Sequence, residues 1–261
     1  MLRKLFSFGI VLILCLIFST NAFGFDVKEI PGSTWNQITL ETNGLTRGLS
    51  TIGYINQGID WGTLPGDITF NTFGEFRYRL RSRKQKYYNA YGPAIGVEFK
   101  KSVFRLGTDY YWEQFPEQRE ESNKLQFYLS GYYDWNLEKI GITKPFNIKS
   151  FPGSTWGNIT QDVDGLTRGL SAIGYINQGI DWITLPGDIT FNTFAEFRYR
   201  LRSRKQQYYN AYGPAVGVEF KKSAFRLGAD YNWERFPSQN KESNKFQVYL
   251  TWYFDWSFLK K

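Results

Sequence analysis

Six arginines fall in two short runs in which every second residue is an arginine. The runs are Arg77, Arg79 and Arg81, and Arg198, Arg200 and Arg202. A guanidinium group offers paired donors whose geometry matches a carboxylate or a phosphate. Because alternate residues of a β-strand share one face, each run would form a basic track along a strand. The sequence therefore predicts two basic tracks. They could bind an anionic solute if the fold makes both of them face the same interior space.

Carboxylates are expected on the same face as these arginines, and they leave a second interpretation open. The alternating pattern places there Arg105 and Arg226 together with Glu75, Glu98, Asp109, Glu113, Glu196, Glu219, Asp230 and Glu234. Charges removed from water need partners. An internal salt-bridge network that neutralises the arginines is thus an alternative to an anion path.

The chain lacks several residue types and motifs on which catalysis and metal binding usually depend. It contains no histidine, which removes the usual general base and the commonest ligand of transition metals. No glycine-rich phosphate loop and no calcium loop occurs, and the carboxylates have no nucleophile at a defined spacing. We expect no catalytic residue, no metal site and no cofactor, so the protein is not predicted to be an enzyme.

The two arginine runs belong to two copies of one longer sequence. The segment from Pro31 to Trp35 recurs from Pro152 to Trp156, a shift of 121 residues, and about three-quarters of aligned positions are identical. No gap is needed between the copies. The boundaries predicted from this repeat are 25–145 and 146–261, with both copies closing one structure.

Within each copy the dominant period is two, which is typical of β-strands with one apolar and one polar face. It is clearest from Ile68 to Arg81, where apolar and aromatic residues alternate with Glu75 and the arginines. Turn signals such as Asn43-Gly44 and Leu64-Pro65-Gly66-Asp67 separate the strands. Long polar connections are expected at 82–90 and 116–124.

The first strand, at about 34–42, has the weakest alternating pattern. However, two copies that are inserted in the same orientation each need an even number of strands. We predict six strands per copy and twelve in all.

The first 24 residues have the form of a cleaved signal peptide. Arg3 and Lys4 precede an apolar stretch from Phe8 to Phe18, and Ala22-Phe23-Gly24 provides a small-residue cleavage site. A single membrane anchor is the alternative, although the stretch is short for one. The only cysteine, Cys15, lies in this segment. We therefore expect export and no disulfide.

The mature chain resembles Gram-negative outer-membrane β-barrels as a class. Its last strand runs in phase from Val248 through Trp256 to Phe258, like the aromatic-ended last strand of such proteins, although Leu259-Lys260-Lys261 follow. The resemblance implies an all-β, antiparallel transmembrane barrel. In a barrel of twelve strands the arginine tracks would face each other. That layout is similar to the small twelve-stranded porins for acidic oligosaccharides, without a shared family motif.

Three functional hypotheses remain from the sequence alone. The first is an outer-membrane channel for passive diffusion of small, preferentially anionic solutes through an arginine-lined lumen. The second is a sealed structural or adhesive barrel with a salt-bridged interior. The third is a secreted soluble protein of two β-domains that binds carbohydrate.

The expected partners follow from the membrane location. They are outer-membrane lipid and lipopolysaccharide, anionic small solutes and, during biogenesis, the barrel-assembly machinery, but not nucleic acid. Without Arg3 and Lys4 of the predicted signal peptide, 30 of the 32 basic residues remain against 24 acidic ones, and the resulting net charge of +6 permits attraction to anionic solutes or lipopolysaccharide. Basic and aromatic residues are expected to meet lipopolysaccharide in two loop segments: Arg83, Lys84, Lys86, Tyr87, Tyr88 and Tyr91, and Arg204, Lys205, Tyr208, Tyr209 and Tyr212.

Overall fold

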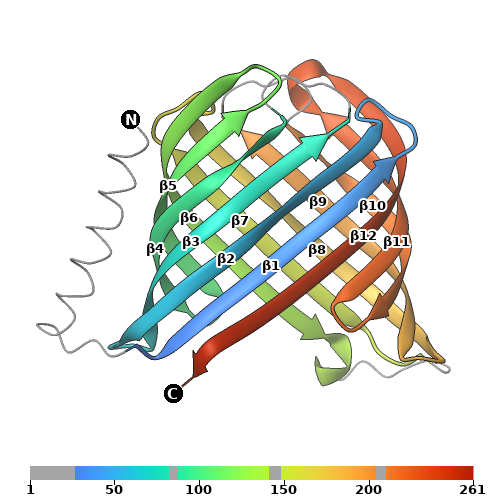
Figure 1. The fold of residues 1–261 in the computed structure, drawn as a ribbon. Helices are drawn as coiled ribbons and strands as arrows, with labels where there is room; N and C mark the ends of the chain where they lie inside the picture. Colours follow the sequence, from blue (N-terminus) through green and yellow to red (C-terminus); the bar gives the residue numbers. More distant parts are fainter. Residues whose placement is uncertain (1–26, 83–87, 141–147, 204–209, 261) are drawn as a thin grey trace, which may run out of the picture.

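The computed structural model describes residues 27–82, 88–140, 148–203 and 210–260, and these form one closed antiparallel β-barrel (Figure 1). Each strand pairs with its neighbours in the chain, and β1 pairs with β12 to close the ring. The strands are β1 Glu29–Glu41, β2 Gly48–Leu64, β3 Ile68–Arg81, β4 Ala90–Lys101, β5 Phe104–Phe115, β6 Glu120–Asn136, β7 Pro152–Asp162, β8 Gly169–Leu185, β9 Ile189–Arg202, β10 Ala211–Lys222, β11 Phe225–Phe236 and β12 Lys241–Lys260. Short 3-10 helices, η1 Leu137–Ile140 and η2 Pro237–Gln239, follow β6 and β11. The predicted number of strands is confirmed.

The period-two pattern sorts side chains between the outside and the inside of the barrel. Large apolar residues point outward and remain exposed, as with Phe104 at 59% and Ile55 at 54%. Polar residues such as Asn71 and Asp230 point inward and are buried. This distribution is the reverse of a soluble protein and matches a barrel surrounded by lipid, in which closure leaves no strand edge unpaired.

Aromatic side chains gather on the outer face near both barrel ends. Tyr110 and Trp112, near the end of β5, meet edge to face with centroids 4.8 Å apart. Tyr133 and Trp135, near the end of β6, stack with centroids 6.2 Å apart. Amphipathic rings are enriched at the two membrane interfaces, so these residues outline the limits of the apolar band. No helix among the described residues is long and apolar enough to cross a membrane.

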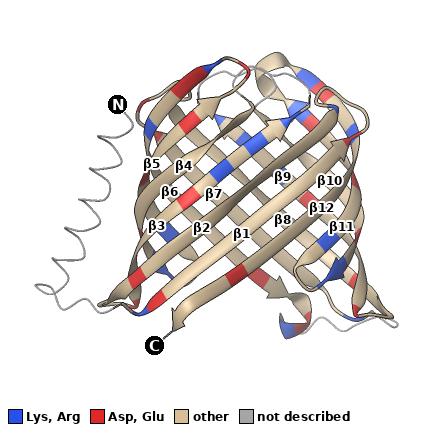
Figure 2. Ribbon diagram, in the orientation of Figure 1, with Lys and Arg blue, Asp and Glu red and all other residues tan. Residues whose placement is uncertain are grey.

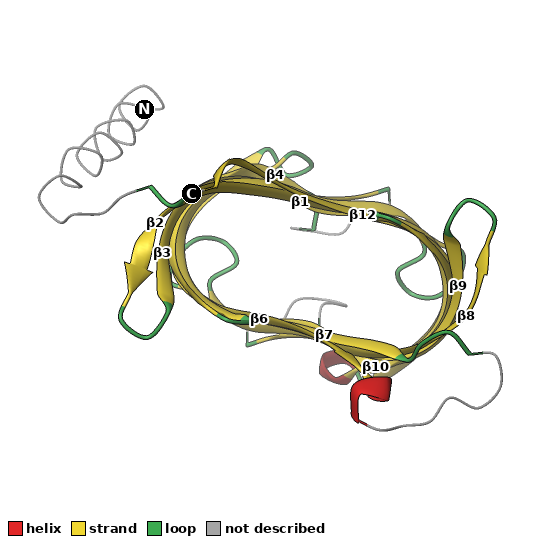
Figure 3. Ribbon diagram, turned by 90° about the horizontal axis from the view of Figure 1, so that it is seen from below, coloured by secondary structure: helices red, strands yellow, loops and turns green. Residues whose placement is uncertain are grey.

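The barrel is oval in cross-section when it is viewed along its axis (Figure 3). Strands β1 and β12 lie in one long wall, and β6 and β7 lie in the opposite wall. Strands β2 and β3 occupy one narrow end of the oval, while β8 and β9 occupy the other. The strands that carry the two arginine runs, β3 and β9, therefore lie at opposite ends of the long axis.

Several connections differ from the sequence prediction. The first strand begins at Glu29 rather than near residue 34, and the first loop spans 42–47 rather than two residues. The first loop is longer than predicted because the Asn43 side chain accepts a hydrogen bond of 2.6 Å from the backbone N–H of Phe246 on β12. The loop therefore lies across the pairing of β1 with β12 that closes the barrel. Strand β6 begins at Glu120, so the connection predicted for 116–124 is only four residues long.

A single barrel also decides between the sequence hypotheses. Strands β2 to β5 recur as β8 to β11 with every boundary shifted by 121 residues, but the two sets share one ring. The hypothesis of two separate soluble β-domains is therefore wrong. The predicted signal peptide lies outside the described residues, and so does most of each basic loop segment predicted to meet lipopolysaccharide.

Candidate functional site

The arginine tracks point into the barrel, and each of their guanidinium groups pairs with acidic residues there. Arg77 donates hydrogen bonds to Asp109 at 2.6 Å and to Gln126 at 2.8 Å, and it also pairs with Glu75. The corresponding residue of the second copy, Arg198, forms the same kind of cluster. It donates to Asp230 at 2.8 Å and to Asn232 at 2.9 Å, and it pairs with Glu196.

The remaining track arginines are held in the same way. Arg79 lies 2.8 Å from Glu113, and Arg200 lies 3.3 Å from Glu234. At the end of each track the arginine side chain is largely covered, 6% exposed at Arg81 and 8% at Arg202: Arg81 faces Glu41 at 3.4 Å, and Arg202 faces Asp162 at 3.9 Å. These contacts join β3 and β9 to strands on both sides, so the tracks brace the wall of the barrel.

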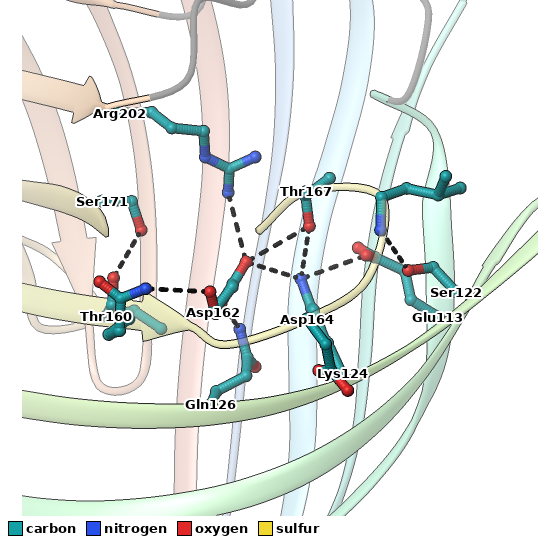
Figure 4. A network of polar contacts seen from close by, with 12 residues as sticks. Glu113, Ser122, Lys124, Gln126, Thr160, Asp162, Asp164, Thr167, Ser171 and Arg202 are labelled. Atoms are coloured by element: carbon teal, nitrogen blue, oxygen red, sulfur yellow. Dashed lines mark hydrogen bonds and ion pairs between the residues drawn. The ribbon is translucent and has the colours of Figure 1, made fainter. Parts of the chain in front are cut away.

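Two buried lysines, which the sequence interpretation missed, connect these clusters across the two seams between the copies, where β6 pairs with β7 and β12 pairs with β1. Figure 4 shows the seam that contains Lys124. Lys124 of β6 lies 3.2 Å from Glu113 and 3.4 Å from Asp162 of β7. Lys245 of β12 lies 3.2 Å from Glu234 and 3.1 Å from Glu41 of β1. The one available sequence signal was that both lysines occupy matching positions of the repeat on the inward face.

Hydroxyl groups complete the seam cluster at β6 and β7. Thr167, in the loop after β7, accepts a hydrogen bond from Lys124 at 3.1 Å and donates one to Asp162 at 3.3 Å. Ser122 accepts a hydrogen bond of 2.9 Å from the backbone N–H of Leu166. The Lys124 ammonium and the Thr167 hydroxyl thus link the carboxylates of Glu113 on β5 and Asp162 on β7.

The ion pairs between described inward-facing residues balance in charge. They involve twelve basic side chains, namely Arg77, Arg79, Arg81, Lys100, Arg105, Lys124, Arg198, Arg200, Arg202, Lys221, Arg226 and Lys245. They also involve twelve acidic ones, namely Glu41, Asp60, Glu75, Glu98, Asp109, Glu113, Asp162, Asp181, Glu196, Glu219, Asp230 and Glu234. Figure 2 shows the two signs interspersed along the strands. Within the described parts of the chain, the ion-pair network therefore carries no net charge.

Arg105 and Arg226 differ from every track arginine. Their side chains are 57% and 54% exposed, against at most 33% for the tracks. Each has only a long ion pair, at 3.7 Å to Glu98 and 3.8 Å to Glu219. Neither guanidinium donates a hydrogen bond to a described residue. Arg105 and Arg226 therefore have the most exposed side chains among the described arginines of the inward-facing network.

Rows of aromatic side chains line the inner wall at the seams. Trp35 of β1 is the cross-strand partner of both Tyr253 on β12 and Tyr54 on β2. The second row is Tyr132, Trp156 and Tyr175 on β6, β7 and β8.

Small residues on β4 make room for the large inward side chains. Ala90 and Ala94 are buried on this face. A Cβ atom at Gly96 would lie 2.7 Å from the ring of Phe73, so that ring lies directly against the glycine. No group of three or more acidic side chains within the described ranges is arranged to hold a metal ion.

The closed barrel with an apolar, aromatic-belted exterior defines the class of outer-membrane β-barrel proteins. No protein-family model matches the chain, and no curated protein sequence is similar to it. Among solved structures, similarity extends to the β-domain of the Bordetella autotransporter BrkA, with 11% identity, a TM-score of 0.37, and coverage of 87% of this chain and 98% of that chain. The KdgM porin matches with 12% identity and a TM-score of 0.33, covering 85% and 99%. LpxR from Salmonella typhimurium matches with 10% identity and a TM-score of 0.37, covering 85% and 100%.

Proposed function

We propose that the protein is an outer-membrane channel for passive diffusion of small solutes, with a modest preference for anions. The observation that carries this proposal is the exposure of inward-facing side chains. Arg105 and Arg226 are more than half exposed, and Ile52 and Ile173, which pair on the inward face with Arg79 and Arg200, are 38% and 37% exposed. Exposure at these positions requires space for water inside the barrel.

The preference for anions rests on fewer arginines than the sequence predicts. The track arginines are neutralised by carboxylates, so their contribution to the potential of the lumen is small. Arg105 and Arg226 carry the accessible positive charge. Two groups in a lumen that also contains Asp134 and Asp255 produce a local attraction rather than a strong field.

A sealed structural barrel is the second candidate, and the balanced ion-pair network favours it. The twelve cations and twelve carboxylates that pair among the described residues are what a closed interior needs, because each buried charge requires a partner. Under this hypothesis the barrel would display its outer loops to a surface partner.

Targeting and partners complete the proposal. The proposed location of the protein is the outer membrane. The chain would be exported by means of the signal peptide predicted at 1–24, and the barrel-assembly machinery would then insert it. The apolar exterior would contact lipid and lipopolysaccharide. Cell fractionation with a gel of heated and unheated samples tests this, and recovery in the soluble periplasm without a mobility shift would contradict it.

Planar-bilayer recording tests the channel itself. Wild-type protein under a salt gradient should conduct with a reversal potential shifted toward the anion equilibrium value. The double variant Arg105→Gln with Arg226→Gln should still conduct but lose most of that shift. A matched control is Arg47→Gln with Arg168→Gln, because these exposed loop arginines occupy matching repeat positions. A silent bilayer with correctly folded, inserted protein would support the sealed barrel instead.

A further inference from the structure

We infer that the lumen binds neutral sugars along two aromatic strips of its inner wall, one at each seam. Each strip is built around a row of three aromatic side chains. The rows are Tyr253, Trp35 and Tyr54 on β12, β1 and β2, and Tyr132, Trp156 and Tyr175 on β6, β7 and β8. This inference rests on the proposed channel, because a sugar must enter the lumen to reach either strip.

Each aromatic row is continuous across three neighbouring strands. Trp35 lies directly opposite Tyr253 on one side and Tyr54 on the other. Side chains in such positions have Cβ atoms about 4.5 to 5.5 Å apart. The ring centroids of Trp35 and Tyr54 lie 6.5 Å apart with planes tilted by 33°, and those of Trp156 and Tyr175 lie 6.4 Å apart with planes tilted by 37°. Each row therefore presents one extended aromatic surface rather than separate rings.

This aromatic surface is accessible from the lumen. Tyr253 is 46% exposed and Tyr132 is 45% exposed. Ile52 and Ile173, the next inward-facing residues along β2 and β8, are 38% and 37% exposed. Exposed apolar patches that are bordered by polar residues mark ligand-binding surfaces. A solute that covers the strips would remove this apolar surface from water and be stabilised by its burial.

Polar side chains border each aromatic row on the same inner face. They lie two residues before or after an aromatic residue of the row, and they are Ser33, Gln37, Asn56, Thr251 and Asp255 at the first seam and Ser130, Asp134, Ser154, Asn158 and Asn177 at the second. Hydroxyl and amide groups donate and accept hydrogen bonds, and a carboxylate accepts them. Ligand sites commonly combine an apolar wall with a few such groups. A sugar ring has the matching surface, namely an apolar C–H face surrounded by hydroxyl groups.

The charge of the strips favours a neutral sugar over an acidic one. None of the bordering side chains is basic, and each strip contains one aspartate. Asp134 accepts a hydrogen bond of 2.5 Å from the hydroxyl of Tyr132, so this carboxylate already lies beside the aromatic surface. A carboxylate accepts hydrogen bonds from sugar hydroxyls but repels a second carboxylate.

Three six-carbon probes test the ring and the charge separately. Glucose is the neutral ring, sorbitol carries the same hydroxyl pattern on an open chain, and glucuronate is the acidic ring. Saturation-transfer NMR titrations of the protein, in a detergent without a sugar head group, measure weak binding of each probe. We expect glucose to bind about 2- to 13-fold more tightly than sorbitol, which is the range that an aromatic contact adds, and more tightly than glucuronate.

Tryptophan variants assign the binding to the strips. Trp35→Leu with Trp156→Leu should remove the advantage of glucose over sorbitol, whereas Trp35→Phe with Trp156→Phe should retain most of it because the aromatic surface remains. The matched control is Trp112→Leu with Trp233→Leu, since these tryptophans occupy equivalent repeat positions on the lipid-facing side of β5 and β11. A heat-dependent gel shift verifies that each variant is folded.

The outcomes separate this inference from the proposed function. A barrel that conducts but binds glucose and sorbitol equally would overturn the strips and leave the channel standing. Glucose binding by a folded barrel that never conducts would support the strips but refute passive diffusion. Tighter binding of glucuronate than of glucose would overturn the neutral class of solute. An equal loss of glucose binding in the lipid-facing control would overturn the assignment to the inner wall.

Discussion

At the residue scale, the inward face is governed by how buried charges are partnered. Glu41 is shared by Arg81 of β3 and Lys245 of β12, and Asp162 is shared by Arg202 of β9 and Lys124 of β6. Each lysine also contacts a second carboxylate. Removing one cation would leave two carboxylates without their full complement of partners.

Lys124→Met should therefore destabilise the barrel strongly. Breaking a buried ion pair by deleting one partner costs about 3 to 5 kcal/mol, because the remaining charge is desolvated and uncompensated. Urea unfolding in detergent or lipid, followed by gel mobility, measures the loss. Lys101→Met is a suitable control, since Lys101 is exposed at the end of β4 and should change stability little. Equal stability of both variants would refute the bracing role of Lys124.

Glycine positions offer a second residue-scale prediction. At Gly96 a Cβ atom would lie 2.6 Å from the carbonyl oxygen of Thr108 and 2.7 Å from the ring of Phe73, so Gly96→Ala forces the wall to move. Overpacking of this kind costs about 1 to 3 kcal/mol. Gly74→Ala is the matched control, because nothing lies within 4 Å and the repeat already carries Ala195 there. Unfolding midpoints should fall for the first variant only.

At the element scale, the two seams make the two halves depend on each other. Strand β1 pairs with β12, and β6 pairs with β7, so each half alone has two unpaired edges. The seam clusters are also divided, since Lys245 and Glu41 belong to different halves. A six-stranded ring is too narrow for these side chains.

The fragment 25–145 should accordingly fail to insert as a stable monomer. Co-expression with residues 146–261 should restore a barrel, because both seams are then available. Heat-dependent gel mobility and size-exclusion chromatography in detergent read the outcome. A membrane-inserted monomer of either fragment would show that the halves close independently.

At the scale of the whole molecule, the balanced network implies that charge selectivity is weak and sensitive to salt. The Debye length falls from about 10 Å at 0.1 M to about 3 Å at 1 M, so the field of two exposed arginines is screened at high salt. We expect the shift of the reversal potential toward the anion value to decrease over this range. A strong preference that persists at 1 M salt would show that the track arginines are free of their carboxylates.

The sequence by itself determined the architecture, because its signals are local. Alternation in stretches such as 68–81 places neighbouring side chains on opposite faces, whichever strands pair. The repeat and the turns then account for the number of strands, and the same alternation places the arginines, their acidic neighbours and Arg105 on the inner face. Loop lengths were less predictable, since the 42–47 loop depends on a contact between Asn43 and the distant residue Phe246.

Only the tertiary structure decided which inward charges are paired and which are accessible. Glu41 and Lys245 are 204 residues apart, and their contact exists because β1 closes on β12 in one particular register. A shift of one residue in that register would turn each strand's side chains to the other face. Ring closure likewise places Trp35 between Tyr253 and Tyr54. Such partnerships depend on distances across the barrel, which spacing along the chain does not encode.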